Sequence, residues 1–223
     1  MTLSPSKLLR GLVVLCLITA WAVLAHYGST GEGNTQLRAA LATAPMVAIA
    51  IILLWRIGNP LWIGIGGFSV LALVATAWPY LQTHIAQLYF VQHLGTNLAL
   101  GILFGSSLFA QRQPLVTQFA LIAHNGTISA AQRRYTRQVT IAWTVFFLVT
   151  ATISVGLFFW APPQAWSVFA NLLTLPLILL MFIIEHLVRH SVLPPDDRSS
   201  IADTIRGYKG RRENIQAMVS KRL

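Results

Sequence analysis

The stretch LLMFIIEHLVRH, residues 179–190, forms the end of a long apolar run and contains acidic and basic side chains that could take part in chemistry. Glu185 and Arg189 are four residues apart, an order that favours an ion pair on one face of a helix. Glu185, His186 and His190 have a spacing that could bind a metal ion, but further ligands are lacking, so we predict no metal and no cofactor. At about 1.5 Å per residue, Glu185 lies about 5 Å below the end of the run and its carboxylate can reach water. We interpret the Glu185–Arg189 pair as structural, with contact to a headgroup, a proton or a partner as the alternative.

A second polar group interrupts the apolar run 87–110: Gln92, His93, Thr96 and Asn97. An unpaired amide at mid-membrane depth is costly, so we expect these side chains to face other helices or a hydrated cavity. Gly101 and Gly105 follow in a GxxxG pattern, which allows two helices to approach closely. We interpret the group as polar contacts inside a helix bundle. The alternative is a cavity, lined by His93 and Asn97 with Asn171 on the same side, that binds a lipid-like ligand.

Basic residues gather before another apolar run: Arg133, Arg134 and Arg137. They follow a capping box in which Ser129 caps a helix and Gln132 completes the pair three residues later. An apolar stretch at 115–123 comes before the box and predicts a short helix along the membrane interface. Because basic residues beside a span meet anionic headgroups, we expect these arginines to set topology and contact phospholipids. A specific anionic headgroup, a diphosphate or an acidic carrier protein is the alternative ligand.

The amino-acid composition predicts that all of these residues belong to a membrane protein. Of the 223 residues, 55% are hydrophobic and 10% are charged, whereas soluble domains carry roughly 25% charged residues. The apolar residues come in blocks, and a membrane span needs about 20 of them. We therefore predict an all-α, polytopic helix bundle over residues 1–192, in which residues 81–87 connect the third and fourth spans. The six spans are expected at about 8–27, 38–55, 61–80, 87–110, 139–160 and 166–188.

The distribution of basic residues predicts an orientation. With six spans, all but one of the 16 Lys and Arg residues fall on one side, and Arg38 is the exception. The positive-inside rule assigns the basic side, and with it both termini, to the cytoplasm. The net charge of +10 is therefore explained without nucleic acid, which would need a folded basic domain with aromatic residues among the charges. The single cysteine, Cys16, excludes a disulfide within the chain.

A basic tail is predicted over residues 193–223. The sequence LPPDD at 193–197 ends the last span, and Ser200 with Asp203 forms a second capping box. Apolar residues then repeat on one face among basic ones, which is typical of an amphipathic segment lying on a membrane surface. A disordered tail is the alternative.

The residue types found in the sequence argue against a transporter and against several classes of enzyme. Ion-coupled carriers usually place a carboxylate or a base deep in the membrane, whereas Glu185 lies near the edge of its span. The chain also lacks an internal sequence repeat of the kind that alternating access uses. No Ser/His/Asp order, HxxxxD pair or glycine-rich phosphate loop occurs in the sequence.

A family resemblance appears over residues 112–195. The segments RQPLVTQFA and RRYTRQVTIAWTVFF resemble the C-terminal part of bacterial inner-membrane proteins that are encoded among aryl polyene pigment genes. Those proteins are similar in turn to the intracellular septation protein A family. The resemblance implies an inner-membrane protein of the cell envelope and brings no catalytic residues with it. The matching features are Pro114, Tyr135, Thr136, Arg137, Trp143, Phe146, Phe147, Trp166, Asn171 and Glu185 with Arg189.

Together these observations predict a non-catalytic accessory or scaffold protein of the bacterial inner membrane. It would act in envelope lipid or polyene biosynthesis, or in cell-envelope and division processes. Its expected partners are membrane lipids, with anionic headgroups at the cytoplasmic face, and envelope-biosynthesis or division proteins, whereas the oligomeric state stays open. A transporter or flippase of a lipid-like product is the first alternative, and a membrane enzyme acting on lipid or acyl groups is the second.

Overall fold

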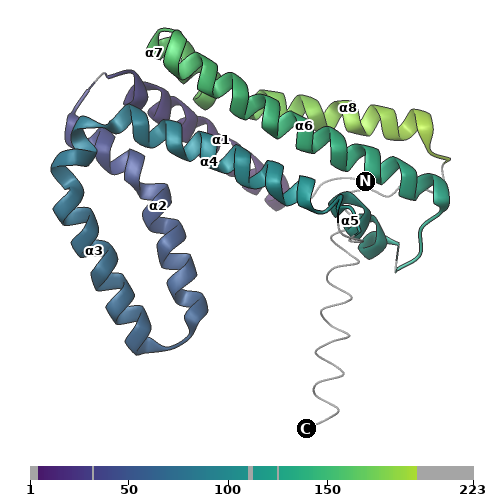
Figure 1. Cartoon of the computed structure of the whole chain (residues 1–223), viewed down its shortest axis with the longest axis horizontal. Helices are drawn as coiled ribbons and strands as arrows, with labels where there is room; N and C mark the ends of the chain where they lie inside the picture. The colour runs from purple at the N-terminus through teal and green to yellow at the C-terminus, as the bar shows by residue number, and fades with distance from the viewer. Residues whose placement is uncertain (1–4, 32, 110–112, 125, 195–223) are drawn as a thin grey trace. The chain divides into compact units, whose positions relative to one another are not determined.

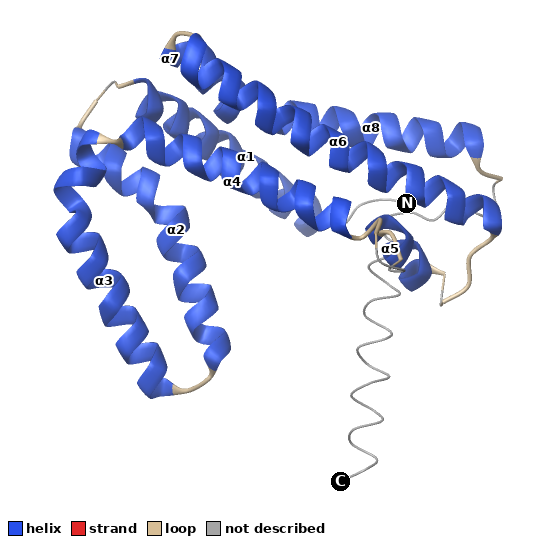
Figure 2. Ribbon diagram, viewed as in Figure 1, coloured by secondary structure: helices blue, strands red, loops and turns tan. Residues whose placement is uncertain are grey.

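The computed structural model describes residues 5–31, 33–109, 113–124 and 126–194. Over this part the chain is built from helices and contains no strand (Figure 1, Figure 2). In chain order the helices are α1 (Pro5–Thr30), α2 (Thr35–Ile57), α3 (Pro60–Thr83), α4 (Ile85–Ser106), α5 (Leu115–Ala123), α6 (Ala130–Trp160), α7 (Pro163–Ser167), the π-helical segment η1 (Val168–Leu173) and α8 (Thr174–Val192).

Five helices of the described part are long and apolar enough to cross a membrane, which makes the chain a multi-pass membrane protein. They are Thr35–Ile57, Pro60–Thr83, Ile85–Ser106, Ala130–Trp160 and Pro163–Val192, the last of which joins α7, η1 and α8. The first span predicted from the sequence corresponds to α1, which is 26 residues long. The count of six spans and the orientation of the termini stay predictions.

Local side chains set the helix ends around the α2–α3 connection. Asn34 caps α2, because its Oδ1 accepts hydrogen bonds from the backbone N–H groups of Gln36 and Leu37 at 2.8 and 3.3 Å. Helix α2 ends at Ile57, and the next residue, Gly58, has a φ of 69°, a left-handed conformation that glycine adopts without strain. Asn59 then caps α3, in which proline occupies the first position, where its missing N–H costs no hydrogen bond.

Several predicted span boundaries differ from the helix ends. Residues 81–87 were expected to be a connection, but they are helical apart from His84, whose N–H donates to the carbonyl of Tyr80 at 3.2 Å. Helix α4 ends at Ser106 rather than at residue 110, and the last helix continues to Val192. Apolarity marks the part of a helix inside the membrane, whereas helices also continue through polar sequence.

Helix α6 begins at Ala130, nine residues before the predicted span at 139–160. The predicted cap at Ser129 is confirmed: its Oγ accepts from the N–H of Gln132 at 3.1 Å. The polar first turns of α6, which follow this cap, continue without a break into the apolar part of the same helix. The predicted tail lies outside the described residues from residue 195 onward, as do its capping box at Ser200 and Asp203.

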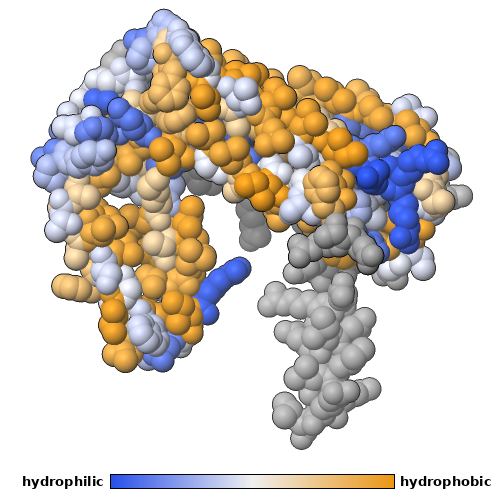
Figure 3. All heavy atoms as spheres, in the orientation of Figure 1, coloured by the Kyte–Doolittle hydropathy of each residue, from blue (hydrophilic) through white to orange (hydrophobic). Residues whose placement is uncertain are grey.

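The chain divides into two compact units. Unit 1 comprises Met1–Gly95 and Ile153–Leu175, and unit 2 comprises Thr96–Thr152 and Pro176–Leu223. The core of unit 1 contains Ala25, Ala39, Ala42, Ile85, Tyr89, Phe90, Trp166 and Ala170. The core of unit 2 contains Tyr135, Val139, Trp143, Phe147 and Leu193. Apolar side chains cover most of the surface of α2 and α3 seen in Figure 3, as expected for helices that face lipid.

Candidate functional site

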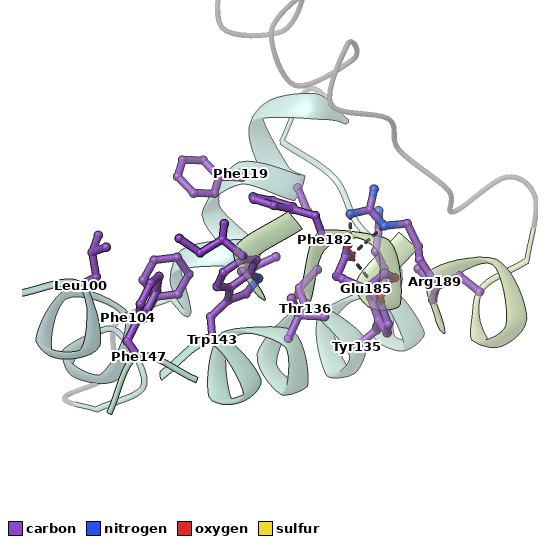
Figure 4. A pocket seen from close by; sticks show the side chains of 16 residues that line it. Leu100, Phe104, Phe119, Tyr135, Thr136, Trp143, Phe147, Phe182, Glu185 and Arg189 are labelled. Carbon is purple, nitrogen blue, oxygen red and sulfur yellow. Dashed lines mark hydrogen bonds and ion pairs between the residues drawn. The ribbon is translucent and has the colours of Figure 1, made fainter. Parts of the chain in front are cut away.

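An apolar pocket of about 560 Å³ lies in unit 2, between α4, α5, α6 and α8. Its volume falls within the roughly 300–1,000 Å³ that small-molecule sites occupy. Figure 4 shows Leu100, Phe104 and Phe147 at one end of the pocket and Glu185 and Arg189 at the other. The described residues that line the pocket are Leu100, Phe104, Val116, Phe119, Ala120, Gln132, Tyr135, Thr136, Val139, Trp143, Phe147, Ile178, Phe182, Glu185, Arg189 and Leu193.

Aromatic rings form much of the apolar wall. The ring of Trp143 stacks on Phe147 with a centroid distance of 5.5 Å and lies 4.8 Å from Phe182. Phe104 contacts Phe147 at 5.6 Å, which brings a ring of α4 into the same wall. Phe119 and Phe182 are about half exposed, at 46% and 47%, so they stand at the rim rather than in the core.

Tyr135, Glu185 and Arg189 form the polar end of the pocket. The guanidinium of Arg189 donates to Glu185 Oε1 from Nη2 at 2.6 Å and from Nε at 3.0 Å. The hydroxyl of Tyr135 lies 2.9 Å from the same Oε1 and 2.9 Å from the backbone oxygen of Glu185. The side chain of Glu185 is only 9% exposed and that of Arg189 19%. The predicted pair is therefore confirmed, but it is more buried than a carboxylate that simply reaches water.

Hydrogen bonds between polar side chains hold α5 against α6. The hydroxyls of Thr117 and Thr136 are 2.8 Å apart, and the N–H of Val116 donates to Thr140 Oγ1 at 3.3 Å. Thr117 is 1% exposed. The predicted helix at 115–123 is confirmed, with one face packed on α6 where the sequence indicated a helix along the interface.

Gln132 anchors the loop before α6. Its side-chain nitrogen lies 2.8 Å from Nε2 of His124, and its side chain is 2% exposed. The sequence predicted Gln132 as part of a capping box, and the contact with His124 places the same residue in the pocket wall. The spacing of residues in the sequence does not predict a contact of this kind between two residues on either side of a loop.

The predicted arginine cluster lies outside the pocket. Arg133, Arg134 and Arg137 are exposed and do not belong to the lining. They alternate along α6 with Gln132, Tyr135 and Thr136, which face inward. Hydrophilic residues gather where α6 begins and α8 ends (Figure 3). The cluster is thus a surface feature, separate from the Arg189 site.

His93 bridges two neighbouring segments in unit 1. Its Nδ1 lies 3.0 Å from Ser154 Oγ and its Nε2 lies 3.0 Å from Thr174 Oγ1. Gln92 donates from Nε2 to the backbone oxygen of Ala42 at 2.6 Å. Both residues make the polar contacts inside a bundle that the sequence predicted.

The other two polar residues of α4 differ from each other. Asn97 is 4% exposed, as expected for an amide inside a bundle. Thr96 is exposed, so the expectation that it faces other helices is wrong. Gly101 and Gly105 are confirmed as positions of close approach, because a Cβ added to them would lie 3.1 Å from Leu148 and from Thr144 of α6, respectively.

Asn171 belongs to a polar cluster that the sequence did not indicate. Its Nδ2 donates to Ser29 Oγ at 3.1 Å and to Ser167 Oγ at 3.2 Å. Nδ1 of His26 lies 2.7 Å from Ser167 Oγ. The serine and the histidine are 141 residues apart in the chain, so no local motif could reveal the contact. Ser167 is fully buried, which leaves no room for a substrate at its hydroxyl.

The histidines near Glu185 are surface residues. His186 and His190 are exposed, with ring centroids 4.2 Å apart, and Nδ1 of His190 lies 2.9 Å from the backbone oxygen of His186. In the part of the chain that the structure describes, no group of three His, Cys, Asp or Glu residues is placed to hold a metal ion.

The fold and the pocket define the class: a multi-pass, all-helical membrane protein with an apolar pocket that ends in an ion pair. No protein-family model, no curated protein and no solved structure matches the chain. The resemblance to proteins of aryl polyene gene clusters and to the septation protein A family stays a prediction.

Proposed function

We propose that this chain is a non-catalytic accessory protein of the bacterial inner membrane that holds a lipid-like molecule in the pocket of unit 2. One observation carries the proposal: an apolar, aromatic-lined pocket of about 560 Å³ ends in the buried Tyr135–Glu185–Arg189 group. An apolar wall with a few convergent polar groups is the usual form of a small-molecule site.

The dimensions of the pocket fit a single chain. Tyr135 of the polar group and Phe147 at the apolar end are twelve residues apart on α6, which at about 1.5 Å per residue corresponds to about 18 Å. Burying apolar surface along this length would stabilise the bound molecule by roughly 0.8 kcal/mol per CH₂ group. An elongated hydrocarbon or polyene chain contacts more of the length of the pocket and more of its aromatic walls than a compact ligand does.

The chemistry of the lining supports binding rather than catalysis. Among the described residues of the wall there is no Ser, Cys, His, Lys or Asp, and the hydroxyl of Tyr135 is engaged with Glu185. The carboxylate of Glu185 is engaged by Arg189 and Tyr135 through one oxygen. Such a carboxylate is suited to orienting a headgroup.

The surface of unit 2 supports a place at the cytoplasmic face. Arg133, Arg134 and Arg137 are exposed near the polar end of α6, where each basic residue contributes about 1 kcal/mol of attraction to anionic headgroups. This arrangement agrees with cytoplasmic termini under the positive-inside rule. The resemblance described above supports a role in envelope lipid or polyene biosynthesis, with division proteins as further partners.

A pocket-filling variant tests the proposal. Ala120 is 6% exposed and lies in the pocket wall on α5, so Ala120→Phe places a ring inside the cavity. Ala123→Phe, on the same helix but outside the lining, is the matched control. Each protein is purified gently from native membranes, and the bound lipophilic molecules are identified by mass spectrometry. We expect a specific molecule with the wild type and the control, reduced at least about tenfold in Ala120→Phe. Equal retention by all three proteins would contradict the proposal.

A further inference from the structure

The two oxygens of the Glu185 carboxylate have different surroundings. Within the described part of the chain, every hydrogen bond to this carboxylate ends on Oε1, from Arg189 and from Tyr135. Oε2 belongs to the same pocket-lining side chain, which is only 9% exposed. A carboxylate oxygen in this position is an acceptor for a donor that a bound molecule brings.

Charges at the polar end of the pocket balance. Among the described residues of the lining, Glu185 and Arg189 carry the formal charges, with opposite signs. They are in direct contact at 2.6 Å, so a charged headgroup placed beside them meets attraction and repulsion at nearly the same distance. Moving a charged headgroup out of water has a cost that this balanced pair does not offset.

From these two observations we propose that the pocket selects amphiphiles whose head is uncharged and donates a hydrogen bond, such as a hydroxyl or a primary amide. The head donates to Glu185 Oε2, and the chain extends along the aromatic wall toward Phe147. The inference rests on the proposed function and adds the class of ligand to it. Arg189 and Tyr135 act as positioning residues, because they hold Oε1 and thereby direct Oε2.

Other headgroups lack one of the two properties. A phosphate or carboxylate head is repelled by Glu185, and a protonated amine is repelled by Arg189. A methyl ester is neutral but has no donor, so it leaves Oε2 without a partner inside the protein. A buried acceptor that loses its hydrogen bond is costly, and this cost gives the pocket its selectivity.

A competition experiment with five amphiphiles of one chain length tests the inference. Purified full-length protein in a non-ionic detergent is incubated with an equimolar mixture of hexadecanol, palmitamide, hexadecyl phosphate, hexadecylamine and methyl palmitate. The retained molecules are separated from the excess, extracted and quantified by mass spectrometry. We expect hexadecanol and palmitamide to exceed each of the others by about tenfold, the effect of one hydrogen bond to a charged group.

Two variants with opposite charge changes sharpen the test. Glu185→Gln removes a negative charge from the lining, so the ratio of hexadecyl phosphate to hexadecanol should rise. Arg189→Gln removes a positive charge, so the ratio of hexadecylamine to hexadecanol should rise instead. Arg56→Gln makes the second charge change at an exposed position of α2, outside unit 2, and should change neither ratio. Ratios within one sample do not depend on the fraction of protein that is folded.

The possible results separate the inference from the proposed function. Retention of all five amphiphiles in equal amounts by the wild type would overturn the inference and leave the pocket as a binding site. Retention of none of them, with no native lipophilic molecule in the purified protein, would overturn the proposed function as well. Preference for hexadecyl phosphate in the wild type would also overturn the inference, because it would show that Arg189 alone selects the headgroup.

Discussion

The carboxylate of Glu185 is stabilised by donors from two helices. Arg189 lies one turn later on α8, and Tyr135 reaches the same oxygen from α6. Because both charges of the pair are largely buried, their attraction is opposed by a large desolvation cost. The pair therefore stabilises the fold less than its short distances indicate, but the loss of one partner leaves the other charge uncompensated.

This asymmetry leads to a prediction at the residue scale. Arg189→Leu should lower the free energy of unfolding by about 3 kcal/mol, because it leaves the carboxylate of Glu185 without its counter-charge. The double variant Glu185→Leu with Arg189→Leu should recover most of that loss. Unfolding by dodecyl sulfate in mixed micelles, followed by circular dichroism, measures both values. A double variant less stable than Arg189→Leu would show that the pair itself stabilises the protein strongly.

Sequence spacing identifies only part of this group. Glu185 and Arg189 are four residues apart on one helix, so local geometry predicts their contact. Tyr135 is fifty residues away from Glu185, and a contact between two helices depends on their rotation and packing, which no local pattern specifies. The cluster around Ser167 escaped prediction for the same reason, because His26 and Ser167 lie on separate helices.

At the scale of the helices, close packing of α4 on α6 shapes the wall of the pocket. Gly101 and Gly105 leave space that Leu148 and Thr144 of α6 occupy. The glycine pattern predicts this approach correctly, because a residue without Cβ allows short distances between helices. The approach also brings Phe104 next to Phe147, which closes one end of the pocket.

A prediction follows for this helix contact. Gly101→Leu should destabilise the protein by about 1–3 kcal/mol, because the added side chain is forced against Leu148. Gly95→Leu on the same helix is the control, because a Cβ at Gly95 meets nothing within 4 Å. The dodecyl sulfate unfolding assay compares the two variants with the wild type. Equal stability of the two variants would contradict the close approach of α4 and α6.

The sequence predicts where the helices lie more accurately than the residues at which they begin and end. The short helix 115–123 coincides with α5, since a run of apolar residues after Pro114 leaves little alternative. The connection predicted at 81–87 is shorter than expected, because only His84 lies between α3 and α4 and the hydrogen bond from Thr83 Oγ1 to the carbonyl of Tyr80 keeps polar residues within α3. Polar side chains that form hydrogen bonds within their own helix let the helix continue through polar sequence. The positions of polar residues then no longer predict where the helix ends.

For the whole molecule, composition alone predicts the class. A chain with 10% charged residues cannot cover a water-exposed surface, and five described helices are apolar enough to cross a membrane. The pocket could not be predicted in this way. Its lining runs from Leu100 to Leu193, and aromatic residues are too common in spans to mark a binding site.

The orientation is the prediction that belongs to this scale. Alkaline phosphatase fused after Gly33 should be active in intact cells, because this loop is expected outside the cytoplasm. A fusion after Leu223 should be inactive, because all Lys and Arg residues except Arg38 are expected on the cytoplasmic side. A green fluorescent protein fusion at the same two sites should give the reverse pattern. Active phosphatase at both sites would mean an odd number of spans.

The length of the pocket has a consequence for membrane asymmetry. From Tyr135 to Phe147 it extends about 18 Å along α6, a little more than half of a hydrocarbon core of roughly 30 Å. Its walls come from the end of α4, from α5, from α6 as far as Phe147 and from α8. Under the proposed function, we expect a bound molecule to have its head at one membrane face and most of its chain within the adjoining leaflet. We therefore expect the protein to draw from a single leaflet and to preserve the sidedness of what it binds.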